Sequence, residues 1–122
     1  MDEALESELR ELHARVCKAI ADPKRLLIIS LLRDGERSVG DICDELRVSQ
    51  SNASQHLAML RERGIVSSRR AGTTVYYSLR SDKILRAIDL MREFVAEAGP
   101  AGPVPDAPPD EPTGRVSGVF LG

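Results

Sequence analysis

The chain has 122 residues, of which 42% are hydrophobic, and it carries a net charge of −2. This length is enough for one domain with a modest core, and no apolar run approaches the roughly 18 residues of a membrane span. The acidic, amphipathic start lacks the basic residues and apolar centre of a signal peptide, so we expect a cytoplasmic protein with no membrane partner. Two cysteines are too few for a disulfide scaffold.

The N-terminal third of the chain predicts two helices. Apolar residues recur at intervals of three and four over residues 3–20, which indicates a helix with one apolar stripe. Asp22 followed by Pro23 is typical of a helix start, because aspartate caps the first turn and proline suits its first position. This second helix runs to about Leu32 and is apolar on nearly every side, so we expect it at the centre of the core.

The next segment predicts two helices joined by a tight turn. Ser38 begins the third helix, and residues 47–49 form the turn. Ser49 is a natural cap for a fourth helix over about 50–63, which Gly64 ends. The residues expected to point inward are Val39, Ile42 and Leu46 of the third helix and Ala53, Leu57 and Leu60 of the fourth.

A hairpin and a last helix follow. β-branched and aromatic residues on both sides of Gly72 predict two strands within residues 65–79. Ser81 and Asp82 cap a helix that ends at about Ala98. Its apolar residues cover more than the stripe that one contact needs, which indicates a dimer partner.

The domain boundary is expected after this helix. Residues 1–98 form the predicted domain, whereas residues 99–122 contain six of the seven prolines and five of the nine glycines. A segment of this composition cannot continue a helix or bury much apolar area, so we expect a disordered tail.

Positive charge is concentrated in one part of the chain. Residues 47–80 contain six arginines and one glutamate, whereas residues 1–46 and residues 81–122 are both net negative. A local positive surface attracts phosphates without making the rest of the molecule adhesive. The charge distribution therefore favours nucleic-acid binding, although the chain as a whole is acidic.

Four segments of the sequence resemble the ArsR/SmtB family of bacterial repressors. They are AIADPKRLLIISLL at 19–32, SVGDICDEL at 38–46, SQSNASQHLAMLRERGIV at 49–66 and RRAGTTVYYSL at 69–79. The resemblance spans about residues 10–97 and implies a mostly α-helical winged helix-turn-helix with a small β-hairpin. It also implies a homodimer formed through the first and last helices, which binds double-stranded operator DNA when empty. An inducer, commonly a metal ion or a thiol-reactive species, releases the DNA in this family.

The fourth helix and the hairpin supply the candidate DNA contacts. Serine, asparagine and glutamine near the start of a helix offer donors and acceptors to bases and phosphates, and arginine suits phosphates and the minor groove. The alternatives are ordinary solvated polar residues on the helix and a solubilising turn in the hairpin. The candidates are Gln50, Ser51, Asn52, Ser54, Gln55 and His56 on the helix and Arg69, Arg70, Thr73 and Thr74 on the hairpin. His56 lies between two faces and suits an internal hydrogen bond equally well, while Arg61 and Arg63 are expected in phosphate contacts or salt bridges.

The candidate sensor residues depart from the best-known sites of the resembled family. The third helix has one thiol, Cys43, in place of a Cys-x-Cys pair, and the last helix has carboxylates but no His or Cys. His13 and Cys17 are four residues apart and share a helix face. These three residues suit As(III) or another thiophilic metal ion, and the two thiols suit oxidation by a peroxide or sulfur species. The alternatives are a metal held by other ligands, or buried cysteines that sense nothing.

The sequence is weighed here as that of a DNA-binding repressor, a protein-interaction module or an enzyme. The arginine-rich hairpin and the polar helix start favour a DNA-binding repressor over a winged-helix protein-interaction module. An enzyme is the weakest option, because the sequence has no Ser/His/Asp set, paired-carboxylate pocket, phosphate loop or cysteine-rich metal cluster.

Overall fold

The computed structural model describes residues 1–99, which belong to two compact units. The first unit is Met1–Asp89 and the second begins at Leu90, within helix α6 (Lys83–Ala98). Apart from Gly99, the predicted 99–122 tail lies outside the described residues. Among residues 1–99, none of the helices has the length and apolar character that crossing a bilayer requires.

The first helical run contains a change of helix type. α1 (Glu3–Leu12) begins at Asp2, whose carboxylate accepts hydrogen bonds from two amides of the first turn. A π-helical turn, η1 (His13–Cys17), follows, and α2 (Lys18–Ile20) ends the run. The predicted helix over 3–20 is confirmed in extent. The π-helical turn within it begins at His13 and ends at Cys17, two of the candidate sensor residues. Such turns occur often at functional positions.

The second predicted helix is α3 (Pro23–Leu31). The Asp22 carboxylate accepts a hydrogen bond of 2.7 Å from the Lys24 amide, as a capping residue does. Ile28 and Ile29 are fully buried. Both belong to the hydrophobic core, where this helix was expected, whereas Leu27 on the same helix is 53% exposed.

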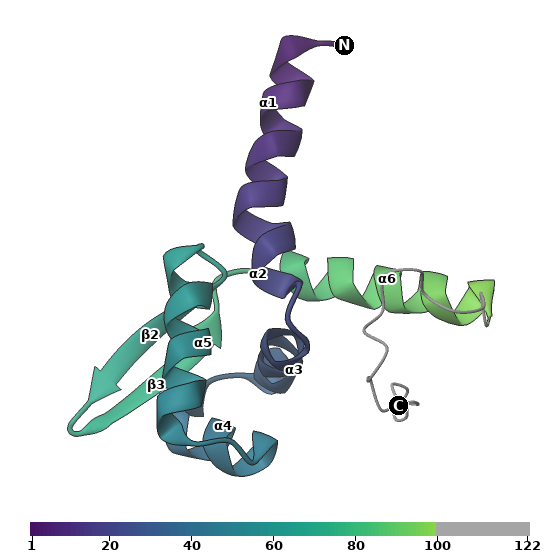
Figure 1. The fold of residues 1–122 in the computed structure, drawn as a ribbon. Coiled ribbons are helices and arrows are strands. Elements are labelled where there is room, and N and C mark those ends of the chain that lie inside the picture. The colour runs from purple at the N-terminus through teal and green to yellow at the C-terminus, as the bar shows by residue number, and fades with distance from the viewer. Residues whose placement is uncertain (100–122) are drawn as a thin grey trace. The chain divides into compact units, whose positions relative to one another are not determined.

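The two central helices and their turn agree with the prediction. α4 (Val39–Leu46) and α5 (Gln50–Glu62) are capped by the hydroxyl groups of Ser38 and Ser49, each accepting a 3.0 Å hydrogen bond from the amide three residues on. Arg47 has a left-handed backbone with φ of 58°, which turns the chain sharply between the helices. The two helices pack against each other, and α5 also packs against α3 (Figure 1).

The sheet has three antiparallel strands in the order β1-β3-β2. β2 (Val66–Ala71) and β3 (Thr74–Leu79) form the predicted hairpin. β1 (Arg37–Ser38) is an additional strand that the sequence did not predict, since two residues are too few to display an alternating pattern. Ser38 belongs to β1, pairs with Tyr76 and caps α4, so the sheet and the helix-turn-helix meet at one residue.

One hydrophobic core lies in the first unit. The predicted inward residues of α5 and Ile42 of α4 have no exposed surface, whereas Val39 and Leu46 are partly buried. The core residues are Ala19, Ile28, Ile29, Leu32, Ile42, Ala53, Leu57, Leu60, Ile65, Val66, Leu85 and Ile88. The core therefore fixes the inner face of α5 and leaves its opposite face to solvent.

Candidate nucleic-acid interface

The start of α5 presents a polar surface. Gln50, Ser51, Ser54 and Gln55 are exposed, whereas Ala53, Leu57 and Leu60 of the same helix are buried. Asn52 is half-buried, and its Oδ1 atom is buried without a hydrogen-bond partner among the described residues. Figure 1 shows the start of α5 and the turn of the hairpin toward the same edge of the first unit. The two elements that carry the DNA candidates therefore extend toward one edge in this view.

His56 belongs to an internal contact. It is half-buried, and its Nδ1 atom lies 3.3 Å from Nη1 of Arg25 on α3. Arg25 also donates from Nε to the backbone carbonyl of Ala19. The imidazole therefore connects α5 to α3 through an internal contact, which is one of the two roles expected for it.

The two hairpin arginines lie on opposite faces of the sheet. Arg70 shares a face with Val66 and pairs with Val75 of β3, on the same side as the core-packed Tyr77. The side chain of Arg70 makes no hydrogen bond or ion pair with a described residue. The neighbouring Arg69 points to the other face, where it pairs with Tyr76. The two residues that the sequence presents as equivalent are therefore in different environments.

Arg69 is held by a carboxylate that sequence reasoning missed. Its Nε and Nη2 atoms donate to the two carboxylate oxygens of Glu36 at 2.9 and 2.7 Å. Its guanidinium also lies 4.8 Å from the centroid of the Tyr76 ring. The hydrogen bonds from Arg69 lower the pKa of the Glu36 carboxyl, and the same bonds raise the pKa of Arg69.

Two other arginines of the basic segment are also engaged within the fold. Arg61 donates from Nη1 to Ser68 Oγ at 3.2 Å, which connects the end of α5 to β2. Arg63 donates to the backbone carbonyl of Ala14 in the first helical run. Arg47, in the turn before α5, makes no such bond with a described residue. The number of arginines available to DNA is therefore smaller than the sequence count implies.

The threonines lie at the tip of the hairpin. Thr73 is exposed in the turn, and Thr74 is half-buried in the first residue pair of β3. Gly72 has a φ of +65°, a backbone conformation that favours glycine and closes the turn. Both threonines therefore lie at the turn end of the hairpin.

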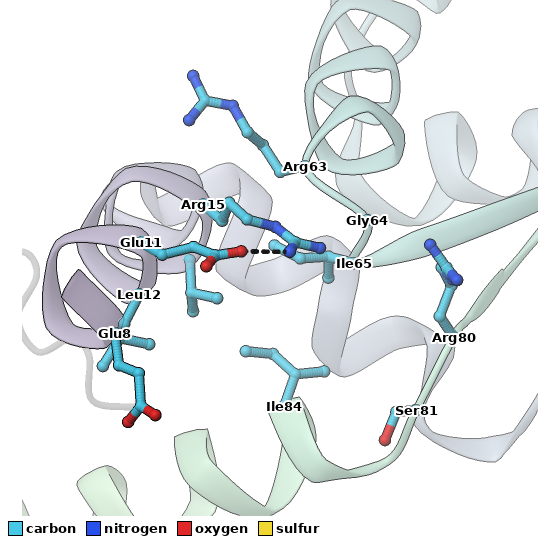
Figure 2. A pocket seen from close by; sticks show the side chains of 11 residues that line it. Glu8, Glu11, Leu12, Arg15, Arg63, Gly64, Ile65, Arg80, Ser81 and Ile84 are labelled. Carbon is cyan, nitrogen blue, oxygen red and sulfur yellow. Dashed lines mark hydrogen bonds and ion pairs between the residues drawn. The ribbon is translucent and has the colours of Figure 1, made fainter. Parts of the chain in front are cut away.

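A pocket of about 340 Å³ lies where the first helical run meets the junction of α5 and β2 (Figure 2). Arg15 crosses its upper part and donates to Glu11 at 2.9 Å, while Ile65 and Ile84 line its apolar part. Gly64, with φ of +79°, lets the chain pass close to Arg15, because a Cβ there would lie 2.9 Å from Nη2. The lining includes Arg63, but none of the ten candidate DNA contacts on α5 and the hairpin and none of the sensor residues.

The candidate sensor residues do not form a metal site within one chain. Cys17 is exposed, and Cys43 is half-buried and packs against the core. His13 is exposed beside a shallow hollow near the N-terminus. Within residues 1–99, no group of three or more His, Cys, Asp or Glu side chains is placed to hold a metal ion. The described part of one chain therefore offers no ready-made site of three donors for a thiophilic metal or metalloid.

Comparison with known proteins agrees with this arrangement. Residues 22–68 match the family model described as "Bacterial regulatory protein, arsR family". The transcriptional activator HlyU of Vibrio cholerae is 42% identical over 81 residues, which cover 66% of this chain and 75% of that protein. The transcriptional repressor SdpR of Bacillus subtilis is 36% identical over 80 residues, covering 66% of this chain and 89% of that protein.

Solved structures give the same result for the fold. Reduced HlyU from Vibrio cholerae has a TM-score of 0.68 and 36% identity, covering 76% of this chain and 97% of that one. A homodimeric winged helix-turn-helix DNA-binding domain from Mycobacterium bovis has a TM-score of 0.70 and 33% identity, covering 80% and 90% of the two chains. α4, α5 and the hairpin are thus the helix-turn-helix and wing of a fold used by transcriptional regulators. This chain belongs to the ArsR family of bacterial regulatory proteins, which are DNA-binding transcriptional regulators and not enzymes.

Proposed function

We propose that this chain is a repressor that binds operator DNA as a homodimer, with α5 in the major groove and the hairpin against the DNA backbone. One observation carries the proposal: the start of α5, which bears exposed polar side chains, lies toward the same edge as the turn of an arginine-bearing hairpin. A helix start of this kind places short polar side chains at base edges, and the hairpin supplies phosphate contacts. The repressor SdpR supports the direction of regulation, whereas HlyU is an activator.

The proposed dimer uses the first and last helices. Leu5, Leu9 and Leu12 of α1 are between 43% and 47% exposed. Four large apolar side chains in the second unit are between 47% and 69% exposed; they are Leu90, Met91, Phe94 and Val95 of α6. Apolar helix faces of this kind are typical of surfaces that another chain covers. The homodimeric state of the Mycobacterium bovis domain supports the same assembly.

The test of operator binding is a selection from random DNA duplexes with the full chain, followed by a reporter assay on the selected site. We expect an inverted repeat, as two symmetric subunits require, and lower reporter expression when the protein is present. Enrichment of no sequence would contradict the proposal, and higher expression would contradict repression.

The Gln55→Ala substitution tests the α5 contact. We expect the selected site to lose about 1 to 3 kcal/mol of binding free energy, because a good side-chain contact to a base supplies that discrimination. Binding to a random duplex should change much less, since it depends on phosphates. Fluorescence anisotropy on both duplexes measures the difference, with Ser30→Ala on α3 as an exposed polar control. Equal losses on the two duplexes would remove Gln55 from the base-reading set.

A second proposal concerns the signal: thiol-reactive species act on Cys17 and Cys43 and release the DNA. The exposure of Cys17 supports it, because a reagent reaches that sulfur without unfolding. In the redox version, two thiols lose two protons and two electrons to a peroxide and form a disulfide, and the peroxide becomes two water molecules. His13 and Cys17 are the first and last residues of η1, and His13 is the third residue of the proposed sensor.

The experiment measures operator affinity of the reduced protein with As(III), Zn(II), Cu(I), hydrogen peroxide or polysulfide. We expect a thiol-reactive agent to weaken binding by the parent, and Cys17→Ser and Cys43→Ser to lose this response. If both variants respond like the parent, the thiols are not the sensor. If the parent responds to none of the agents, the protein is a winged-helix regulator without metal or thiol sensing.

A further inference from the structure

The ion pair between Arg69 and Glu36 reduces the positive charge that the hairpin offers to DNA. In the sheet, Arg69 lies opposite Tyr76, and Tyr76 lies opposite Ser38 of β1. Glu36 directly precedes β1. Arg69 therefore reaches from β2 across the Tyr76 ring of β3 to the carboxylate beside β1, and it spans the width of the sheet.

The carboxylate occupies the part of Arg69 that binds a phosphate well. Arg69 uses Nε and Nη2 together, which is the forked geometry that arginine also offers to two oxygens of a phosphate. The charges of the two side chains nearly cancel at a distance of 2.7 to 2.9 Å. A DNA phosphate approaching this face therefore meets a carboxylate beside a guanidinium that already has a partner.

The pair is nevertheless accessible to solvent. The Arg69 side chain is 56% exposed and the Glu36 side chain 36% exposed. An ion pair exposed to this degree contributes little to stability, so a phosphate that is held close by other contacts can replace the carboxylate. A phosphate that meets the hairpin without such contacts has no comparable advantage.

We propose that Glu36 acts as an internal substitute for a DNA phosphate on Arg69 and thereby limits non-specific DNA binding. This inference rests on the proposed DNA-binding function and assigns a specificity-determining role to a residue outside the basic segment. Non-specific affinity comes almost wholly from phosphate contacts, so neutralising one hairpin arginine lowers it. At the operator, contacts from α5 hold the hairpin against the DNA. Replacing the Glu36 carboxylate by a phosphate on Arg69 therefore costs a smaller share of the affinity there than in non-specific binding.

The test is the Glu36→Gln substitution in the full chain, which keeps the side-chain length but removes the charge. We expect affinity for a random-sequence duplex to rise several-fold at low salt, with a salt dependence steeper by about 0.9 per protomer, the contribution of one phosphate. Affinity for the selected operator should rise less, so that the ratio of specific to non-specific binding falls. The matched control is Glu62→Gln, an identical charge change at an exposed position near the end of α5.

A double-mutant cycle with Arg69→Gln shows whether Glu36 acts through Arg69. We expect Glu36→Gln to have no effect on random-duplex binding in that background. Three results would overturn the inference: weaker binding by Glu36→Gln, an equal gain from Glu62→Gln, or a gain that persists without Arg69. If the parent itself binds no DNA, the proposed function fails. If the parent binds DNA and Glu36→Gln changes nothing, only the inference about Glu36 fails.

Discussion

Replacing Leu57 with alanine is expected to lower the free energy of unfolding by about 2 to 5 kcal/mol, which is the range for a fully buried leucine. Leu57 has no exposed surface and lies on the inner face of α5. α5 packs against α3, α4 and β2, and Leu57 belongs to the core cluster to which all three elements contribute. The effect should be seen as a lower midpoint in urea denaturation, with the slope unchanged.

The control is Leu27→Ala, the same chemical change at a position that is 53% exposed. We expect that variant to change stability by no more than about 0.5 kcal/mol, as surface substitutions do. Both variants are compared at one protein concentration, because the stability of a dimer depends on concentration. Equal losses from the two substitutions would mean that the inner face of α5 is not the centre of the core.

The second large effect is expected for Arg70→Ala, which should weaken DNA binding more than Arg69→Ala. The Arg70 guanidinium has no hydrogen-bond or ion-pair partner among the described residues, whereas that of Arg69 already donates two hydrogen bonds to Glu36. Loss of one phosphate contact reduces the salt dependence of binding by about 0.9 for each protomer, so a dimer loses about twice that amount. Arg70→Ala should also weaken binding to the operator and to random DNA by similar factors.

The measurement is a titration of both duplexes across a range of salt concentrations. Arg86→Ala, on an exposed residue of α6 that pairs with Asp82, serves as a charge-matched control. An unchanged salt dependence for Arg70→Ala would remove this residue from the interface. A larger loss for Arg69→Ala than for Arg70→Ala would show that the Glu36 pair presents Arg69 to the DNA.

Local features of the fold could be predicted because their causes lie within a few residues. Asp22, Ser38 and Ser49 cap helices through hydrogen bonds to amides two or three residues away, so their roles are visible in the sequence. The inner face of α5 follows from the spacing of its apolar residues. The apolar composition of α3 placed it at the centre of the core, but only the tertiary structure shows that its Leu27 is 53% exposed.

Contacts between distant residues could not be predicted from local patterns. Glu36 and Arg69 are 33 residues apart, and β1, which places Glu36 beside the hairpin, has only two residues. Arg63 and its acceptor Ala14 are separated by 49 residues. A count of charges in a sequence window treats all six arginines of residues 47–80 as equivalent. The fold makes them different, because three of them have acceptors within the protein.

The candidate DNA residues were predicted by residue type and helix position, and the fold sorts them further. Gln50, Ser51, Ser54 and Gln55 are exposed, as a base-reading surface requires. His56 is drawn toward Arg25, a contact that no sequence pattern marks.

Ser38, which belongs to both β1 and the cap of α4, affects how the protein would recognise DNA shape. The residue pairs with Tyr76 of the hairpin and caps α4, and α4 packs against α5, so Ser38 connects the hairpin to the helix-turn-helix. A hairpin and a helix held at a constant separation fit a duplex only when the width of its grooves matches that separation. Groove width varies with base sequence even where no base is touched. An operator would therefore be selected in part by the geometry of the base pairs between the helix and the hairpin.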